Sequence, residues 1–104
     1  MKLESIALHY GYNSDENDQK SATTPIYQTS GFTIDSTQHG ADLFDLKVEG
    51  NIYSRIGNPT NAVLEKRLAE MEGGIAALSL ASGMSAITYA IQTITRSGDN
   101  IVST

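Results

Sequence analysis

A short apolar run between two helical patterns restricts the fold of this chain more than any other feature. Residues 75–81 have the sequence IAALSLA, which contains no charged side chain and has the length of a strand. A strand that is apolar on both faces is typical of a parallel sheet, because helices cover both sides of such a sheet. The run therefore predicts a buried strand in an α/β fold.

The sequence on the amino-terminal side of this run predicts an amphipathic helix. Asn58 is a good helix cap, and Pro59 suits the first helical position, where an N–H group would have no partner in any case. The apolar stripe of the helix consists of Leu64, Leu68 and Met71. Gly73 and Gly74 are expected to end the helix, since glycine accepts the left-handed backbone that follows a last turn.

A second helix is expected directly after the run, beginning at Ser82 and Gly83. Its apolar face, with spacings of three and four residues, consists of Met84, Ile87, Ile91 and Ile94. Gly98 is expected to close it, and residues 100–104, NIVST, are typical of the start of another buried strand. The order helix, strand, helix, strand is the repeating unit of an α/β parallel sheet.

Residues 1–57 have no comparable pattern and are expected to form an irregular arm, whereas residues 58–104 begin an α/β domain. The stretch 12–25 is polar and turn-forming, and residues 26–32 favour an extended chain rather than a strand of a sheet. A short helix is expected from Ser36 to Leu46, capped by its first residue. Its apolar contacts would come from Ala41, Leu43 and Phe44.

The composition argues against several classes of function. Seven basic and twelve acidic side chains give a net charge of −5, which argues against a nucleic acid or an anionic membrane as a partner. The absence of cysteine excludes disulfides, thiolate metal sites and a cysteine nucleophile. His9 and His39 lie far apart, have no metal-ligand spacing and are interpreted as ordinary surface or packing residues. No apolar run approaches the roughly 20 residues of a membrane helix, and no secretory signal is evident, so a soluble, cytoplasmic protein is expected.

The chain ends at Thr104, within the second predicted strand. One strand and the start of another cannot cover the faces and edges of a parallel sheet. We therefore expect the 104 residues to be the front part of a larger protein.

Two stretches have the composition of an anion site. Ser82 and Gly83 lie between the predicted strand and helix, where a helix start presents unpaired N–H groups and glycine lets an anion approach the backbone. Tyr53 and Arg55 would lie on the same side of an extended strand, so a phenol and a guanidinium could bind the same phosphate. The alternative is structural: Ser82 is then a helix cap, Gly83 a tight turn and Arg55 a solvated loop residue. The spacing does not show whether the two stretches meet.

These motifs resemble those of a known family. NIYSRIGNPTNAVLEKRLAEMEGG, residues 51–74, is followed by ASGMSAI, residues 81–87, and the pair resembles the cysteine and methionine metabolism family of pyridoxal-phosphate (PLP) enzymes. The resemblance runs from about Leu8 to the last residue. Within the family, the lead-in DLFDLKVEGNIYSR and the stretch PIYQTSGF resemble the O-acetylhomoserine sulfhydrylase subgroup.

The resemblance implies a fold, a cofactor site and an assembly. The second part of the chain would contain the first helix, strand and helix of the large PLP-binding domain of a fold-type I enzyme, which is similar to aspartate aminotransferase. The backbone N–H groups of Gly83 and Met84, beside Ser82, would hold the PLP phosphate. Tyr53 and Arg55 would reach the phosphate in a neighbouring subunit of a homotetramer built from dimers, and Tyr53 could also face the reacting amino acid.

The resemblance also implies what lies further along such a chain. The lysine that binds PLP covalently, the aspartate that pairs with its pyridine nitrogen and the arginine that binds the substrate carboxylate have no counterpart in this sequence. The four lysines lie in N-terminal or exposed helical contexts and are not candidates for the PLP-binding lysine; they are Lys2, Lys20, Lys47 and Lys66. The isolated chain is therefore expected to bind PLP weakly or not at all and to be inactive.

The leading hypothesis is the N-terminal part of an O-acetylhomoserine sulfhydrylase, a transferase of methionine and cysteine biosynthesis. The whole enzyme would convert O-acetyl-L-homoserine and sulfide into homocysteine and acetate. A second hypothesis keeps the chemistry and changes the substrate, as in methionine γ-lyase or cystathionine γ-synthase. A third treats the chain as a complete, non-catalytic module that binds and modulates a partner subunit.

Overall fold

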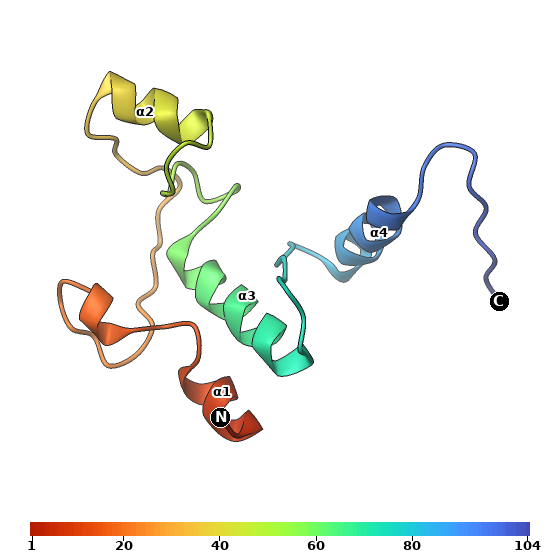
Figure 1. The fold of residues 1–104 in the computed structure, drawn as a ribbon, viewed down its shortest axis with the longest axis horizontal. Helices are drawn as coiled ribbons and strands as arrows, with labels where there is room; N and C mark the ends of the chain where they lie inside the picture. Colours follow the sequence, from red (N-terminus) through yellow and green to blue (C-terminus); the bar gives the residue numbers. More distant parts are fainter.

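The computed structural model describes residues 1–104. The chain consists of helices joined by irregular segments (Figure 1). Its elements are α1 (Leu3–His9), the short 3-10 helix η1 (Ser14–Glu16), α2 (Thr37–Phe44), α3 (Pro59–Glu72) and α4 (Gly83–Ile94). No strand is formed, and one isolated antiparallel bridge joins Gly31 to Tyr53. The segment 26–32 is thus extended without belonging to a sheet, as predicted.

The two ends of α3 are those that the sequence predicts. Asn58 caps the helix by accepting a hydrogen bond from the Thr60 N–H at 2.9 Å, and Pro59 occupies the first position. Gly73 has a φ of 65°, in the left-handed region, and its N–H bonds back to the carbonyls of the last turn. A side-chain cap, a proline and a left-handed glycine therefore define this helix from local sequence alone.

The helix α2 confirms the predicted cap and part of the predicted contact. The Ser36 Oγ accepts a hydrogen bond from the His39 N–H at 3.0 Å. Leu43 is 3% exposed and packs against Gly50, where an added Cβ would lie 2.7 Å from the Leu43 Cδ2. The prediction was wrong for Ala41 and Phe44, which are both exposed, because no other segment covers them.

The predicted irregularity of residues 1–57 was wrong at the amino terminus, where α1 forms and packs along α3. The Arg67 Nε donates to the Tyr10 carbonyl at 2.9 Å. Gly11, with a φ of 83°, lies so close to α3 that a Cβ would be 3.0 Å from the Val63 carbonyl oxygen. A seven-residue helix without a side-chain cap is marginal by itself, so α1 depends on this contact, which no local signal predicts.

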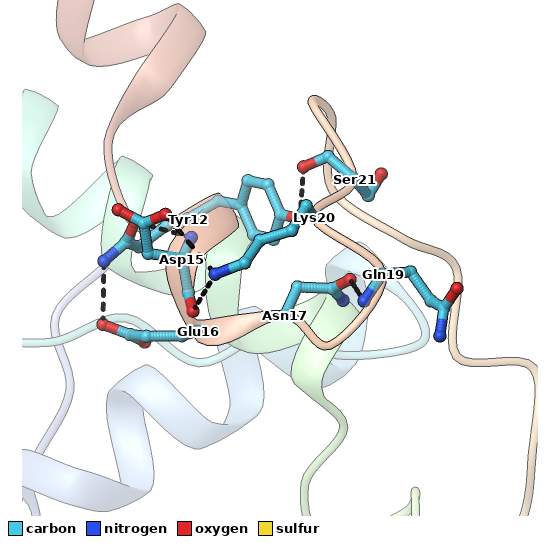
Figure 2. Close-up of polar contacts among 8 residues, drawn as sticks. Tyr12, Asp15, Glu16, Asn17, Gln19, Lys20 and Ser21 are labelled. Atoms are coloured by element: carbon cyan, nitrogen blue, oxygen red, sulfur yellow. Dashed lines mark hydrogen bonds and ion pairs between the residues drawn. The ribbon is translucent and has the colours of Figure 1, made fainter.

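The polar stretch after α1 folds back on itself through its own side chains (Figure 2). The Tyr12 hydroxyl donates to the Ser21 carbonyl at 2.7 Å, and the Lys20 Nζ donates to the Asp15 carbonyl at 3.0 Å. The Asn17 Oδ1 accepts from the N–H of residue 19 at 3.0 Å. These bonds confirm the predicted turns and fix a loop that has no apolar core.

The two predicted strands are not formed. Residues 75–81 and 100–104 have no regular secondary structure, and four of their five large apolar side chains are exposed; these are Ile75, Leu78, Ile101 and Val102. A parallel strand exists only through hydrogen bonds to neighbouring strands, and this chain provides none. The helix α4 also ends at Ile94, four residues before the predicted stop at Gly98, with Thr95 as its last cap.

The molecule has almost no core. Its radius of gyration is 17.1 Å, whereas a compact chain of this length has about 13 Å. Three residues are buried: Gly40, Leu43 and Asn58. The helix α4 packs against no other helix and extends away from the rest of the chain (Figure 1). The structure contains no helix with the length and hydropathy of a membrane span.

Candidate functional site

The start of α4 has free backbone donors. The Ser82 Oγ accepts from the Ser85 N–H at 3.1 Å and donates to the Ser85 Oγ at 2.9 Å. The first internal bond runs from the Ala86 N–H to the Ser82 carbonyl. The N–H groups of Gly83 and Met84 therefore have no acceptor in this chain, and they lie at the positive end of the helix dipole.

The glycine at this helix start has open space around it. A Cβ built on Gly83 would meet no atom of the chain within 4 Å, and its φ is not in the left-handed region. Neither packing nor backbone conformation within the chain therefore requires glycine here. A group from outside the chain can approach the two free N–H groups closely, as an anion does at such a site.

Tyr53 and Arg55 lie together, as predicted, but not for the predicted reason. The Arg55 guanidinium carbon is 5.3 Å from the centre of the Tyr53 ring, a cation–π distance. Residues 54–56 form a turn, closed by hydrogen bonds from the Ile56 and Gly57 N–H groups to the Tyr53 carbonyl at 2.9 and 3.0 Å. The turn, rather than the alternation of an extended strand, brings the two side chains together.

The pair is available to a ligand. Tyr53 is 40% exposed, and Arg55 is exposed and in no ion pair, although acidic side chains outnumber basic ones in this chain. Stacking on a ring occupies one face of the guanidinium and leaves its in-plane N–H groups free to bind the two oxygens of a phosphate. The phenol and guanidinium thus offer several donors to one anion.

The structure does not bring the two parts of the site together. The segment 50–57 lies beside α2 and the start of α3, and α4 lies apart from it (Figure 1). No hydrogen bond joins Tyr53 or Arg55 to residues 82–84. The chain therefore carries two separate groups of anion donors, which we call the turn donors (Tyr53, Arg55) and the helix-start donors (Ser82, Gly83, Met84).

One contact near the helix-start donors was missed by the sequence analysis. The Glu65 Oε1 accepts hydrogen bonds from both the N–H and the hydroxyl of Ser79, each at 2.8 Å. This contact ties the segment 75–81 to α3 three residues before Ser82. A signal was present, because Ser79 is the one polar side chain in an apolar run, and such a residue usually has a hydrogen-bond partner.

One titratable group has a clearly shifted pKa, and it lies outside both groups of donors. The negative charge of Glu70, together with a hydrogen bond that the phenol donates to that carboxylate and slight burial, raises the pKa of Tyr10 above its ordinary value. Tyr10 lies where α1 meets α3, and it remains a neutral phenol at physiological pH.

Comparison with known proteins places the chain in one enzyme family. The profile of the family described as Cys/Met metabolism PLP-dependent enzyme matches residues 4–104. The chain is 53% identical over 104 residues to O-acetyl-L-homoserine sulfhydrylase 1 of Thermus thermophilus and covers 24% of it. It is 47% identical over 103 residues, 98% of its length, to the homocysteine/cysteine synthase of Saccharomyces cerevisiae, and covers 23% of that protein. L-methionine gamma-lyase of Treponema denticola is 46% identical over 99 residues, 95% of this chain and 24% of the lyase.

A solved structure supports the same relationship. The crystal structure of a protein assigned as an O-acetylhomoserine (thiol)-lyase from Campylobacter jejuni matches 95% of this chain with a TM-score of 0.87 and 42% identity. The matched part is 24% of that protein, which contains N'-pyridoxyl-lysine-5'-monophosphate. The chain thus spans about a quarter of the length of the relatives that it matches.

Proposed function

The chain belongs to the Cys/Met metabolism family of PLP-dependent enzymes, and we propose that it is the N-terminal part of an O-acetylhomoserine sulfhydrylase. This proposal rests on the start of α4. There the N–H groups of Gly83 and Met84 have no acceptor within the chain, and Gly83 has open space around it and no role in packing. The 53% identity to a sulfhydrylase over the whole chain supports the choice of enzyme within the family.

The helix-start donors fit the phosphate of PLP. Two free backbone N–H groups, the positive end of a helix and the missing Cβ of Gly83 are the features of a phosphate site. When PLP is bound, it supplies the electron sink for the carbanions formed from an amino-acid substrate. Ser82 caps the helix and so fixes the direction of the two N–H groups. Gly83 and Met84 would donate these N–H groups to the phosphate.

The turn donors fit the same phosphate from another chain. Arg55 keeps its positive charge at any relevant pH and offers paired donors, and the Tyr53 hydroxyl adds another. Because the turn donors and the helix-start donors lie apart in one chain, we assign them to two different active sites, each shared between neighbouring subunits. This assignment requires a dimer at least, and we propose a homotetramer of two such dimers.

The proposed fold is the α/β domain of a fold-type I enzyme, with residues 58–104 as its beginning. Residues 75–81 and 100–104 become strands once neighbouring strands supply hydrogen bonds, and α4 then covers the sheet with its apolar face. The exposure of Leu78, Ile101 and Val102 in this chain supports the proposal, since these side chains have no cover of their own. Residues 1–57 supply the turn donors to the neighbouring subunit.

The proposed reaction replaces the acetate of O-acetyl-L-homoserine with sulfide and gives homocysteine and acetate. The test uses the complete protein that contains this chain, purified with PLP. We expect homocysteine to form from O-acetyl-L-homoserine only when sulfide is added, and its yield to match the acetate released. Release of methanethiol from methionine without sulfide-dependent homocysteine formation would replace this function with that of a methionine γ-lyase, which the relative from Treponema denticola supports.

The same assay separates the remaining alternatives. Condensation of an activated homoserine with cysteine, in place of sulfide, would indicate a cystathionine γ-synthase. A protein that binds a partner subunit and shows none of these activities would be the non-catalytic module.

A further inference from the structure

Asn58 makes more contacts than a helix cap needs. Its side chain is the one buried polar side chain of the molecule, and the residue is 8% exposed. The Oδ1 accepts from the Thr60 N–H at 2.9 Å, which is the capping bond. The Nδ2 donates to the Tyr27 carbonyl at 2.8 Å and to the Ser54 Oγ at 3.0 Å, and these two bonds join α3 to two other segments.

Two neighbouring hydroxyls complete the connection. The Thr60 Oγ1 donates to the Pro25 carbonyl at 2.8 Å and accepts from the Tyr27 N–H at 2.9 Å. The Ser54 Oγ donates to the Thr29 carbonyl, and the Ser54 N–H donates to the Ser30 carbonyl at 2.8 Å. We call Ser54, Asn58 and Thr60, with the backbone of residues 25–30 that they bind, the Asn58 cluster.

The choice of asparagine is not explained by capping. Ser36 and Ser82 cap α2 and α4 with one hydroxyl oxygen each. Aspartate caps a helix as well as asparagine does. Aspartate, however, has no N–H to donate to the Tyr27 carbonyl or to the Ser54 Oγ. The two amide donors are therefore the property that distinguishes Asn58 from a simple cap.

The cluster acts directly on the turn donors. Ser54 lies between Tyr53 and Arg55 in the sequence, and its N–H and hydroxyl are both bonded within the cluster. The Arg55 side chain is exposed, has no ion pair and stacks only on the neighbouring Tyr53 ring, so the position of the pair depends on the backbone of the turn. A donor that is fixed in advance binds an anion with less loss of conformational entropy than a mobile one.

We propose that Ser54, Asn58 and Thr60 are positioning residues, which hold Tyr53 and Arg55 in the geometry that binds a phosphate across the subunit boundary. This inference rests on the proposed function of the turn donors. It assigns a role to the asparagine and threonine that follow the tyrosine and arginine, beyond starting a helix.

The test compares Asn58→Asp with Asn61→Asp in the PLP-loaded protein that contains this chain. Asn61 is exposed in the first turn of α3 and its side chain makes no hydrogen bond, so its variant adds the same charge at the same helix end. Loss of the two amide donors should raise the dissociation constant of PLP about tenfold in N58D. It should also accelerate amide exchange at Ser54 and shift the phosphorus NMR signal of PLP, while N61D matches the unmodified protein in all three.

A second variant and a reference variant keep the outcomes separate. Ser54→Ala removes the acceptor of Asn58 and the donor to Thr29 without touching the cap, and it should lower PLP affinity in the same direction. Arg55→Ala tests the turn donors themselves. If R55A weakens PLP binding and N58D and S54A do not, the positioning role is overturned and the proposed function stands. If R55A has no effect on PLP affinity, the phosphate role of the turn donors is wrong and the positioning role falls with it.

Discussion

The region around the start of α3 and the region from residue 75 onward form helices in the same way but are held in place differently. Asn58 and Ser82 both cap a helix through a side-chain oxygen. Around Asn58, segments that are distant in the sequence are joined by hydrogen bonds to α3. Around α4, the Glu65–Ser79 contact is the one side-chain tie to the preceding helix.

The two regions differ in whether their polar and apolar groups find partners within the chain. Polar groups near α3 are satisfied within the chain, whereas the apolar face of α4 and residues 75–81 and 100–104 remain uncovered. Caps are local and form in either setting, but an apolar face gains stability only when other surface covers it. The α3 region is therefore held by hydrogen bonds within the chain, although Leu64 and Leu68 of its own apolar stripe are also exposed. The α4 region has only the Glu65–Ser79 contact and lacks a cover for its apolar face.

The strongest test of this contrast compares two leucine-sized side chains. Leu43→Ala should lower the local stability of α2 by about 2–3 kcal/mol, because Leu43 is 3% exposed and fills the space beside Gly50. Ile94→Ala should change the stability of α4 by less than about 0.5 kcal/mol, since Ile94 is already 83% exposed in this chain. Amide exchange across α2 and α4 in the 104-residue chain measures both. Equal effects would mean that the α4 face is covered, and would remove the contrast.

A second test asks whether the open space at Gly83 belongs to a ligand. In the PLP-loaded protein, Gly83→Val should raise the PLP dissociation constant about 100-fold, because the side chain displaces a phosphate from N–H donors worth about 1.5–3 kcal/mol each. The helix itself should persist, because an added Cβ meets no atom of the chain within 4 Å. Ala86→Val, an exposed position one turn further along α4, is the control for the low helix propensity of valine. Unchanged affinity in G83V would place the phosphate elsewhere.

A third test concerns the one tie between α3 and the α4 region. Glu65→Ala should accelerate amide exchange at Ser79 about tenfold, since it removes the acceptor of two hydrogen bonds. Glu65→Gln keeps an oxygen acceptor and should retain most of the protection. Glu72→Ala removes the same charge from an exposed position of α3 and should leave Ser79 unchanged. Similar exchange at Ser79 in E65A and E72A would show that the segment 75–81 is not held by Glu65.

The same contrast explains which features the sequence could predict. The bounds of α3, the cap of α2, the start of α4 and the proximity of Tyr53 to Arg55 depend on a few neighbouring residues, and these predictions were confirmed. The cap at Ser82, which was the structural alternative, also forms. The helix α1 was missed because it has no cap and depends on Arg67 and Gly11 for its contact with α3. The strand at 75–81 was predicted from its apolar pattern, but strand formation requires partners that this chain does not provide.

The features of the candidate site can also be separated into those that local sequence predicts and those that depend on contacts in the folded chain. Free donors at the start of α4 follow from Ser82 and Gly83 alone, because every helix start leaves N–H groups unpaired. The bonds from Asn58 to Tyr27 and Ser54 join residues 31 and 4 positions apart, and only the second separation could arise from local sequence. The sequence therefore predicts the donors, whereas the groups that hold them require the folded chain.

The smallest expected effect concerns the packing of α1 on α3. The negative charge of Glu70 raises the pKa of Tyr10 in the folded chain, so the folded state keeps this proton to higher pH than the unfolded state does. The stability that this tyrosine contributes is therefore fully present below the ordinary tyrosine pKa of about 10 and is lost as pH rises through the raised value. The tyrosinate absorbance of the unmodified chain minus that of Tyr10→Phe isolates this titration, and amide exchange in α1 should quicken over the same range. Glu70→Gln should return the titration to the ordinary range and remove the pH dependence of α1. An unchanged titration in E70Q would show that Glu70 does not cause the shift.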